Sequence, residues 1–358
     1  MLLLSKKKLL IALVVLLACS LAGQHCFSQT IEIEEELTCP SMTPKEMKSF
    51  LRSLLNWKGS RTISVLKSFY PDLKQSELLR LQIVVKDFGL DKTYRGFYAH
   101  KNVKNEAVIY LDCSRGSIMS WESLLAHEIA HHLNSKRNLA PWMDEMLAQL
   151  VEVNANPLYP FPRIQVLKDL FVVPGFFPTE RPFQATESYA MNLLFAMYIS
   201  ENFRGFRAFQ SLNQDIFSMD DFSRKLKEYA SHETQFDWIR DAISPKSLIR
   251  HFGLAMNINL PTRNGGTVFK VPGWSGFEKE SLLAKKGTYY VQPGGFVRIS
   301  SIFGSSLMAT SGVEVYRILK DGQQFLIQPV DQKVVGQWSE NFLVLINTSL
   351  TDYLELSL

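Results

Sequence analysis

Residues 120–135 read SWESLLAHEIAHHLNS and contain the five-residue pattern HEIAH, an H-E-x-x-H motif. On a helix, side chains four residues apart project from one face, about one turn apart. His127 and His131 could therefore bind one Zn²⁺ ion through their imidazole nitrogens. Glu128 is not a ligand in this arrangement but can act as the general base toward water. A solvated or core-bonded histidine pair is the simpler alternative, so the surrounding sequence has to distinguish the two.

Local signals favour a helix at this motif. No Gly or Pro occurs in residues 117–139, and Ser120 is suited to be the N-cap. Trp121, Leu125 and Ile129 recur every four residues, as expected of a buried helical stripe.

A catalytic zinc ion needs a third protein ligand and one open coordination position. Glu145 follows His131 by 14 residues in the string PWMDEMLAQLVE, residues 141–152. Pro141 is typical of a first helical position, and the following pattern is helical. A turn between two packed helices would bring Glu145 against the histidine face.

The two strings together resemble the gluzincin metallopeptidases, the thermolysin-like clan. In that family H-E-x-x-H is followed, on the next helix, by a ligand Glu in a string like W-x-x-E-x-x-A, here WMDEMLA. The resemblance covers about residues 94–203 and implies a zincin-like catalytic domain. It implies His127, His131 and Glu145 as ligands of one Zn²⁺ ion and Glu128 as the catalytic base. Met146 stands where these families often have Gly, which could narrow the cleft.

The resemblance also calls for a downstream Tyr or His that donates to the oxyanion. Tyr189, in the string ESYA, is the candidate, with an ordinary core tyrosine as the alternative. We expect Asp144, Gln149 and Glu152 to be able to orient the ligands by hydrogen bonds, although a solvated helix face is the default interpretation of each. His132 faces about 100° away from His131 and is expected to be structural.

Residues 1–28 have the character of an export signal. Lys6, Lys7 and Lys8 precede an apolar run at residues 9–18, which is too short for a transmembrane helix. Either Cys19 is lipidated, as in a bacterial lipoprotein, or cleavage follows one of the small residues between 20 and 28. The expected location is therefore the bacterial periplasm, the envelope through a lipid anchor, or the medium.

Composition excludes some classes of function. The chain has 358 residues, 46% of them hydrophobic, enough for about two globular domains. The net charge is +4, and the three lysines of the signal account for most of it, so nucleic acid is not an expected partner. Cys39 and Cys113 remain in any mature form and could pair in an oxidising compartment; two unrelated buried thiols are the alternative.

The predicted fold is α+β. A zincin-like domain, mostly helical with a small sheet, is expected at residues 29–258, and a small all-β sandwich-like domain at 259–358. Residues 29–93 belong to the first domain or form an inhibitory lead. Helices are predicted at about 43–57, 74–88, 141–152, 185–203, 205–212, 220–231 and 236–243, and a long Pro-rich loop at 155–183. Strands are predicted at about 94–100, 107–112, 268–271, 288–291, 296–300, 313–319, 325–328 and 342–346. Strand 107–111 could pair with an extended peptide or be an ordinary core strand.

The sequence thus predicts an exported zinc metallopeptidase that acts on protein or peptide substrates. The alternative from another class is an envelope ligand-binding protein whose zinc site is vestigial or structural. Within the β domain no cluster of chemically active residues is visible, so we expect it to be a scaffold or accessory.

Overall fold

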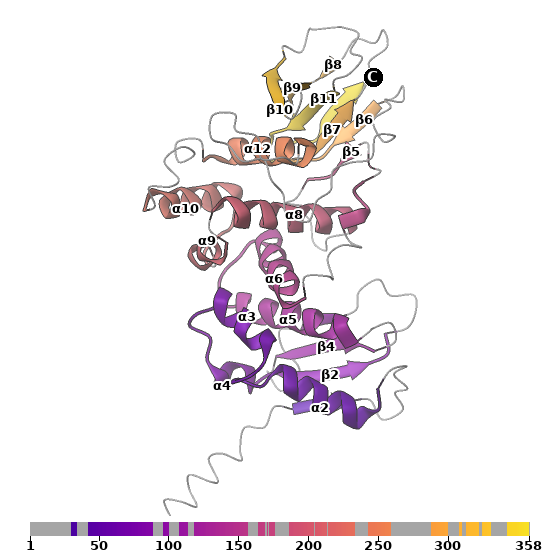
Figure 1. Ribbon diagram of the computed structural model, residues 1–358, viewed down its shortest axis with the longest axis vertical. Coiled ribbons are helices and arrows are strands. Elements are labelled where there is room, and N and C mark those ends of the chain that lie inside the picture. The colour runs from indigo at the N-terminus through magenta and orange to yellow at the C-terminus, as the bar shows by residue number, and fades with distance from the viewer. Residues whose placement is uncertain are drawn as a thin grey trace, which may run out of the picture.

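The structure is a computed structural model. It describes residues 30–33, 42–88, 96–99, 107–113, 118–156, 164–168, 170, 172–175, 186–203, 205–212, 214–232, 243–258, 288–299, 308–309, 313–321, 324–330 and 342–357. Figure 1 shows three tiers: a small sheet with its helices, a layer of helices, and a set of C-terminal strands. The chain is thus a mixed α/β fold with small sheets, compatible with the predicted α+β class. The predicted export signal lies outside the described residues.

The first sheet has the strand order β1-β2-β4-β3. Its strands are β1 (Thr30–Ile33), β2 (Gln82–Lys86), β3 (Gly96–Ala99) and β4 (Val108–Asp112). β1, β2 and β4 run parallel, and β3 is antiparallel to β4. The strand pair predicted at 94–100 and 107–112 is therefore confirmed. β4 lies between β2 and β3, so the prediction that strand 107–111 could offer an edge to a peptide is wrong.

The predicted helix at 74–88 is also wrong. The chain forms one helical turn, α4 (Gln75–Leu78), and then strand β2. Burial alternates along β2, with Ile83 and Val85 buried opposite Ile109 and Leu111 of β4. The β-branched run fits a pleated surface better than a helix, and pairing with two neighbouring strands decides the outcome.

Helix α2 (Pro44–Leu54) confirms the helix predicted at about 43–57. The Glu46 amide donates to the Thr43 hydroxyl at 3.3 Å, and the Thr43 amide donates to the Glu46 carboxylate at 2.9 Å. This reciprocal pair is a capping box. A further helix that the sequence reasoning did not predict, α3 (Arg61–Phe69), follows it.

Helix α5 (Ile118–Asn134) carries the H-E-x-x-H motif and packs between sheet and helices. It contacts β3, β4, α3 and α6 (Pro141–Ala155), and nearly every side chain from Trp121 to Asn134 is buried. The helix begins two residues before Ser120, so the prediction that Ser120 is the N-cap is wrong. A helix buried on all sides is a rigid support for its polar side chains.

Helix α8 (Thr186–Asn202) forms the middle tier with α9 (Phe206–Ser211), α10 (Met219–Ser231) and α12 (Pro245–Ile258) (Figure 1). The first three confirm predicted helices. Most of the helix predicted at 236–243 lies outside the described residues, as does much of the Pro-rich stretch. None of the helices in the described ranges is long and apolar enough to cross a membrane.

The C-terminal strands form two sheets, with orders β10-β9-β11-β7-β5 and β6-β12-β8. The strands are β5 (Val172–Val173), β6 (Thr288–Val291), β7 (Phe296–Ile299), β8 (Met308–Ala309), β9 (Val313–Asp321), β10 (Gln324–Pro329), β11 (Phe342–Asn347) and β12 (Leu354–Ser357). Five of them confirm predicted strands, and the one predicted at 268–271 lies outside the described residues. β5, β8 and β12 were not predicted.

The segments before residue 258 contact the C-terminal strands directly. β5, from the Pro-rich stretch, is the end strand of the five-stranded sheet, and α12 packs on β11. Arg250 of α12 donates twice to the Glu314 carboxylate of β9, at 2.5 and 2.6 Å. The domain boundary at residue 258 stays a prediction. Cys113 is disulfide-bonded; Cys39 lies outside the described residues, so their pairing also stays a prediction.

The close approach of Gly175, just after β5, to the turn between β6 and β7 can be tested by mutation. A Cβ atom at Gly175 would overlap the carbonyl oxygen of Pro293. We expect Gly175→Ala to lower the free energy of unfolding by about 1–3 kcal/mol, the usual cost of overpacking. Denaturant unfolding measures it, with Gly59→Ala as control, because the nearest atom to a Cβ there is 3.8 Å away. Equal stability of the two variants would contradict the close approach.

Candidate metal centre

Helix α5 brings His127 and His131 together on one face. Their Nε2 atoms lie 3.0 Å apart, and the rings meet edge to face with centroids 4.7 Å apart. His127 is buried, and His131 is partly exposed toward a pocket. The four-residue spacing on a continuous helix is sufficient to produce this juxtaposition.

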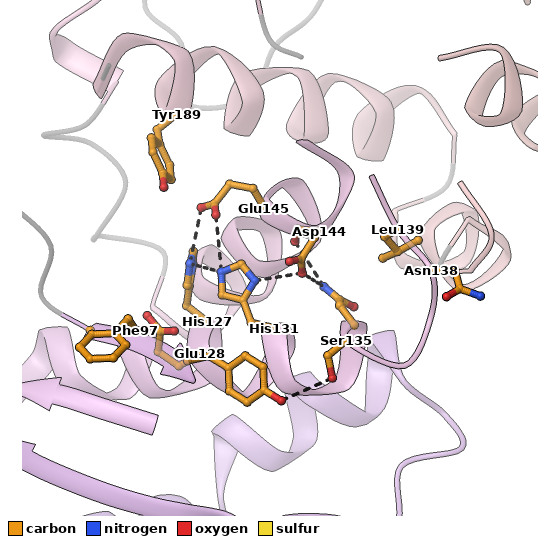
Figure 2. Close-up of a pocket in the computed structure, with 13 residues that line it drawn as sticks. Phe97, His127, Glu128, His131, Ser135, Asn138, Leu139, Asp144, Glu145 and Tyr189 are labelled. Atoms are coloured by element: carbon orange, nitrogen blue, oxygen red, sulfur yellow. Dashed lines mark hydrogen bonds and ion pairs between the residues drawn. The ribbon is translucent and has the colours of Figure 1, made fainter. Parts of the chain in front are cut away.

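Glu145 reaches the same point from α6. Its Oε1 lies 3.5 Å from Nε2 of His127, and its Oε2 lies 3.5 Å from Nε2 of His131. Figure 2 shows the carboxylate above the two imidazoles, hanging from the neighbouring helix. Oε1 is buried and accepts no hydrogen bond from the residues that the structure describes. The three predicted ligands are therefore brought together.

Two more carboxylates contact the imidazoles at Nδ1, the nitrogen on the other side of each ring from Nε2. Nδ1 of His127 lies 3.0 Å from Oε2 of Glu152, and Nδ1 of His131 lies 2.9 Å from Oδ1 of Asp144. The predicted hydrogen bonds of Asp144 and Glu152 to the two imidazoles are confirmed, and their role in orienting metal ligands stays a prediction. Gln149 instead donates its side-chain amide to Asn192 at 3.1 Å.

These bonds determine which nitrogen faces the centre. An ionised carboxylate only accepts hydrogen bonds, so each neutral imidazole carries its proton on Nδ1 and presents the Nε2 lone pair. In the neutral form that metal binding requires, two lone pairs and a carboxylate would converge with no donor among them. Ligand atoms around a shared ion at about 2.0–2.2 Å would be about 3.3 Å apart, close to the 3.0 and 3.5 Å found here. The donor set therefore fits a metal ion, and its chemistry does not fix which one.

The electrostatics agree with a cation site. Burial disfavours the charged form of His131, but Asp144 and Glu145 outweigh burial and raise its pKa to about 10. Burial likewise opposes charge on His127, and Glu145 with Glu152 still raises its pKa. These three carboxylates around two imidazoles thus create a negative potential that favours positive charge.

Glu128 lies beside the cluster without joining it. Its side chain is buried, and it lines the same pocket as the three ligand candidates. Burial raises its pKa above the usual range, which the nearby His127 and His131 offset only in part. A Cβ atom at Gly96 of β3 would lie 3.1 Å from Oε1 of Glu128, so the strand approaches this carboxylate closely because residue 96 has no side chain.

The pocket has a volume of about 820 Å³ and opens between β3, α5, α6 and Tyr189. This volume is in the range of small-molecule binding pockets. Tyr189 hangs from α8 at the level of Glu145 (Figure 2), half-buried in the pocket wall. The structure thus places Tyr189 at the site, and its role as an oxyanion donor stays a prediction.

His132 does not join the ligand cluster, in agreement with its predicted rotation of about 100° from His131. Its Nδ1 lies 3.3 Å from the hydroxyl of Tyr98, whose ring it meets edge to face. Sequence reasoning missed Gly96 and Tyr98 as pocket residues, although it placed them on a strand next to the motif helix. It also missed Asn134, whose position three residues after His131 was a usable signal.

Comparison of the sequence with protein-family models and with curated proteins gives no match. The chemistry of the residues themselves therefore defines the site: two imidazoles and one carboxylate that could hold a metal ion, with a second carboxylate beside them.

Proposed function

We propose that the chain is an exported zinc-dependent metallopeptidase that hydrolyses peptide bonds in protein or peptide substrates. The observation that carries the proposal is the convergence of His127, His131 and Glu145 in one pocket with Glu128. Three protein ligands in a solvent-accessible pocket leave a position open, as catalytic zinc sites require, whereas structural sites are closed by four ligands.

Zinc is the proposed metal because the donor set combines two imidazoles with a carboxylate, a ligand mixture typical of hydrolytic zinc sites. When bound there, zinc would polarise a carbonyl group and lower the pKa of a water molecule. Iron(II) sites also use two His and one carboxylate. The adjacent Glu128 favours hydrolysis, since a general base is what the attack of water on a carbonyl needs.

The chain's own residues supply the proton transfers. Glu128 takes a proton from the attacking water as the water oxygen adds to the scissile carbonyl carbon. The same carboxyl group then gives that proton to the leaving amine as the carbon–nitrogen bond breaks. Tyr189 would donate a hydrogen bond to the oxyanion that develops in between.

The substrate is proposed to bind as an extended chain. β3 is the last strand of the first sheet among the described residues, and Gly96, Phe97 and Tyr98 line the pocket. The outer edge of such a strand offers backbone donors and acceptors to a peptide. Support for export comes from residues 1–28, with Cys19 as the lipidation site if the chain is anchored. The C-terminal sheets would serve as scaffold.

Metal removal tests the proposal. We expect the purified chain to cleave members of a peptide library, to lose this activity after dialysis against a chelator, and to regain it with one equivalent of Zn²⁺. Cleavage that is insensitive to the chelator would contradict a zinc mechanism. Zinc binding without cleavage of any peptide would favour the alternative of a binding protein with a vestigial site.

A further inference from the structure

A buried tyrosine from a distant part of the sequence is connected to the candidate metal centre. Tyr70 follows α3, and its hydroxyl donates to Oδ1 of Asn134 at 2.8 Å. Both side chains are almost completely buried, at 1% and 2% exposure. Asn134 in turn donates through Nδ2 to Oδ1 of Asp144 at 2.9 Å. The same Oδ1 lies 2.9 Å from Nδ1 of His131.

The hydrogen bond from Tyr70 to Asn134 determines which group donates in the next hydrogen bond, between Asn134 and Asp144. Burial raises the pKa of Tyr70, so its hydroxyl stays protonated and can donate. In a side-chain amide the oxygen accepts hydrogen bonds and the nitrogen donates them. The Tyr70 hydroxyl therefore requires the Asn134 oxygen to face Tyr70. The amino group must then face Asp144. That carboxylate accepts twice, from Asn134 and from the imidazole N–H.

We infer that Tyr70 and Asn134 are positioning residues that fix the orientation of Asp144 and thereby present the Nε2 lone pair of His131 to the metal ion. Without Asn134, the side-chain carboxylate of Asp144 would keep only its hydrogen bond with His131 among the described residues. The amide of Asn134 holds it in the one orientation that also reaches the imidazole. This inference rests on the zinc site of the proposed function and adds residues that contact neither metal nor substrate.

Removal of the tyrosine hydroxyl is the mildest test. In Tyr70→Phe the shape of the side chain is kept, but the buried Oδ1 of Asn134 loses its hydrogen bond. The amide is then held only through Nδ2, which donates to Oδ1 and to the backbone oxygen of Asp144, so Asp144 is oriented less firmly. We expect the dissociation constant for Zn²⁺ to rise about 10-fold in Tyr70→Phe and about 10–100-fold in Asn134→Ala. Competition with a chromophoric chelator measures both. The matched control is Tyr198→Phe, another fully buried tyrosine, on α8, which should bind zinc as the wild type does.

The double variant distinguishes positioning from a general loss of stability. If Tyr70 acts only through Asn134, Tyr70→Phe in the Asn134→Ala background should change the zinc dissociation constant by less than about twofold. If the two substitutions act independently on the structure, the factors by which each raises the zinc dissociation constant should multiply in the double variant. Cobalt(II) provides a second measurement on folded protein: its visible spectrum should change in Tyr70→Phe and stay the same in Tyr198→Phe.

The outcomes separate this inference from the proposed function. Equal zinc affinity of Tyr70→Phe and wild type, or multiplied effects in the double variant, would overturn the inference alone. A wild-type chain that binds no zinc would overturn both. The expected affinity changes together with absent peptide cleavage would support the positioning chain and contradict the peptidase.

Discussion

Glu128→Gln is expected to lower kcat for peptide cleavage by about 10²–10⁴-fold, the usual contribution of a general base. Zinc affinity should change little, because Glu128 is not among the three converging ligand candidates. Glutamine has nearly the same shape, so the close contact with Gly96 should be preserved. The base is lost because an amide cannot take up a proton at neutral pH. Steady-state kinetics and zinc titration of the same preparation measure the two effects.

The matched control is Glu122→Gln, six residues or about 1.7 turns earlier on α5. Glu122 accepts from Thr62 at 3.4 Å and is not among the pocket residues. That variant should keep wild-type kcat. Full proteolytic activity of Glu128→Gln would contradict the proposed mechanism, whatever the zinc content.

Glu145→Ala is expected to weaken zinc binding by more than about 100-fold, beyond the range typical for loss of an outer partner. The substitution removes the carboxylate that faces both Nε2 atoms at 3.5 Å. Two imidazoles on one helix would then be the only protein ligands. Cleavage should disappear at zinc concentrations that saturate the wild type, and isothermal titration gives the affinity.

Glu152→Gln is the graded comparison for Glu145→Ala. Glu152 touches His127 only through Nδ1, so its loss should weaken zinc binding by about 10–100-fold. Glu228→Gln, at an exposed position on α10, should have no effect. If Glu145→Ala binds zinc as well as Glu228→Gln does, Glu145 is not a ligand.

The centre of the site could be predicted from sequence because its geometry is local. His127 and His131 meet through helix periodicity alone, and Glu145 needs only the packing of the next helix. Asp144 and Glu152 lie on that same helix, so their reach toward the imidazoles also follows from short-range geometry. Among the surrounding elements, helices with a regular apolar pattern, such as α8, could also be predicted.

What sequence could not provide depends on long-range packing. Tyr70 meets Asn134 across 64 residues, and no local pattern marks that contact. The approach of Gly96 to Glu128 depends on how β3 lies on α5. Residues 82–86 became a strand because β1 and β4 flank them, although the leucines before them favoured a helix. β5, only two residues long, forms through its pairing with β7.

Zinc K-edge X-ray absorption on the purified, zinc-loaded chain tests the ligand set most directly. We predict one zinc ion per chain with nitrogen and oxygen neighbours only, at about 2.0–2.2 Å, including two imidazoles and an exchangeable position. The imidazole signal should be lost in a His127→Ala, His131→Ala double variant. A chain that retains no zinc, a sulfur neighbour at about 2.3 Å, or a spectrum unchanged in that double variant would contradict the proposed centre.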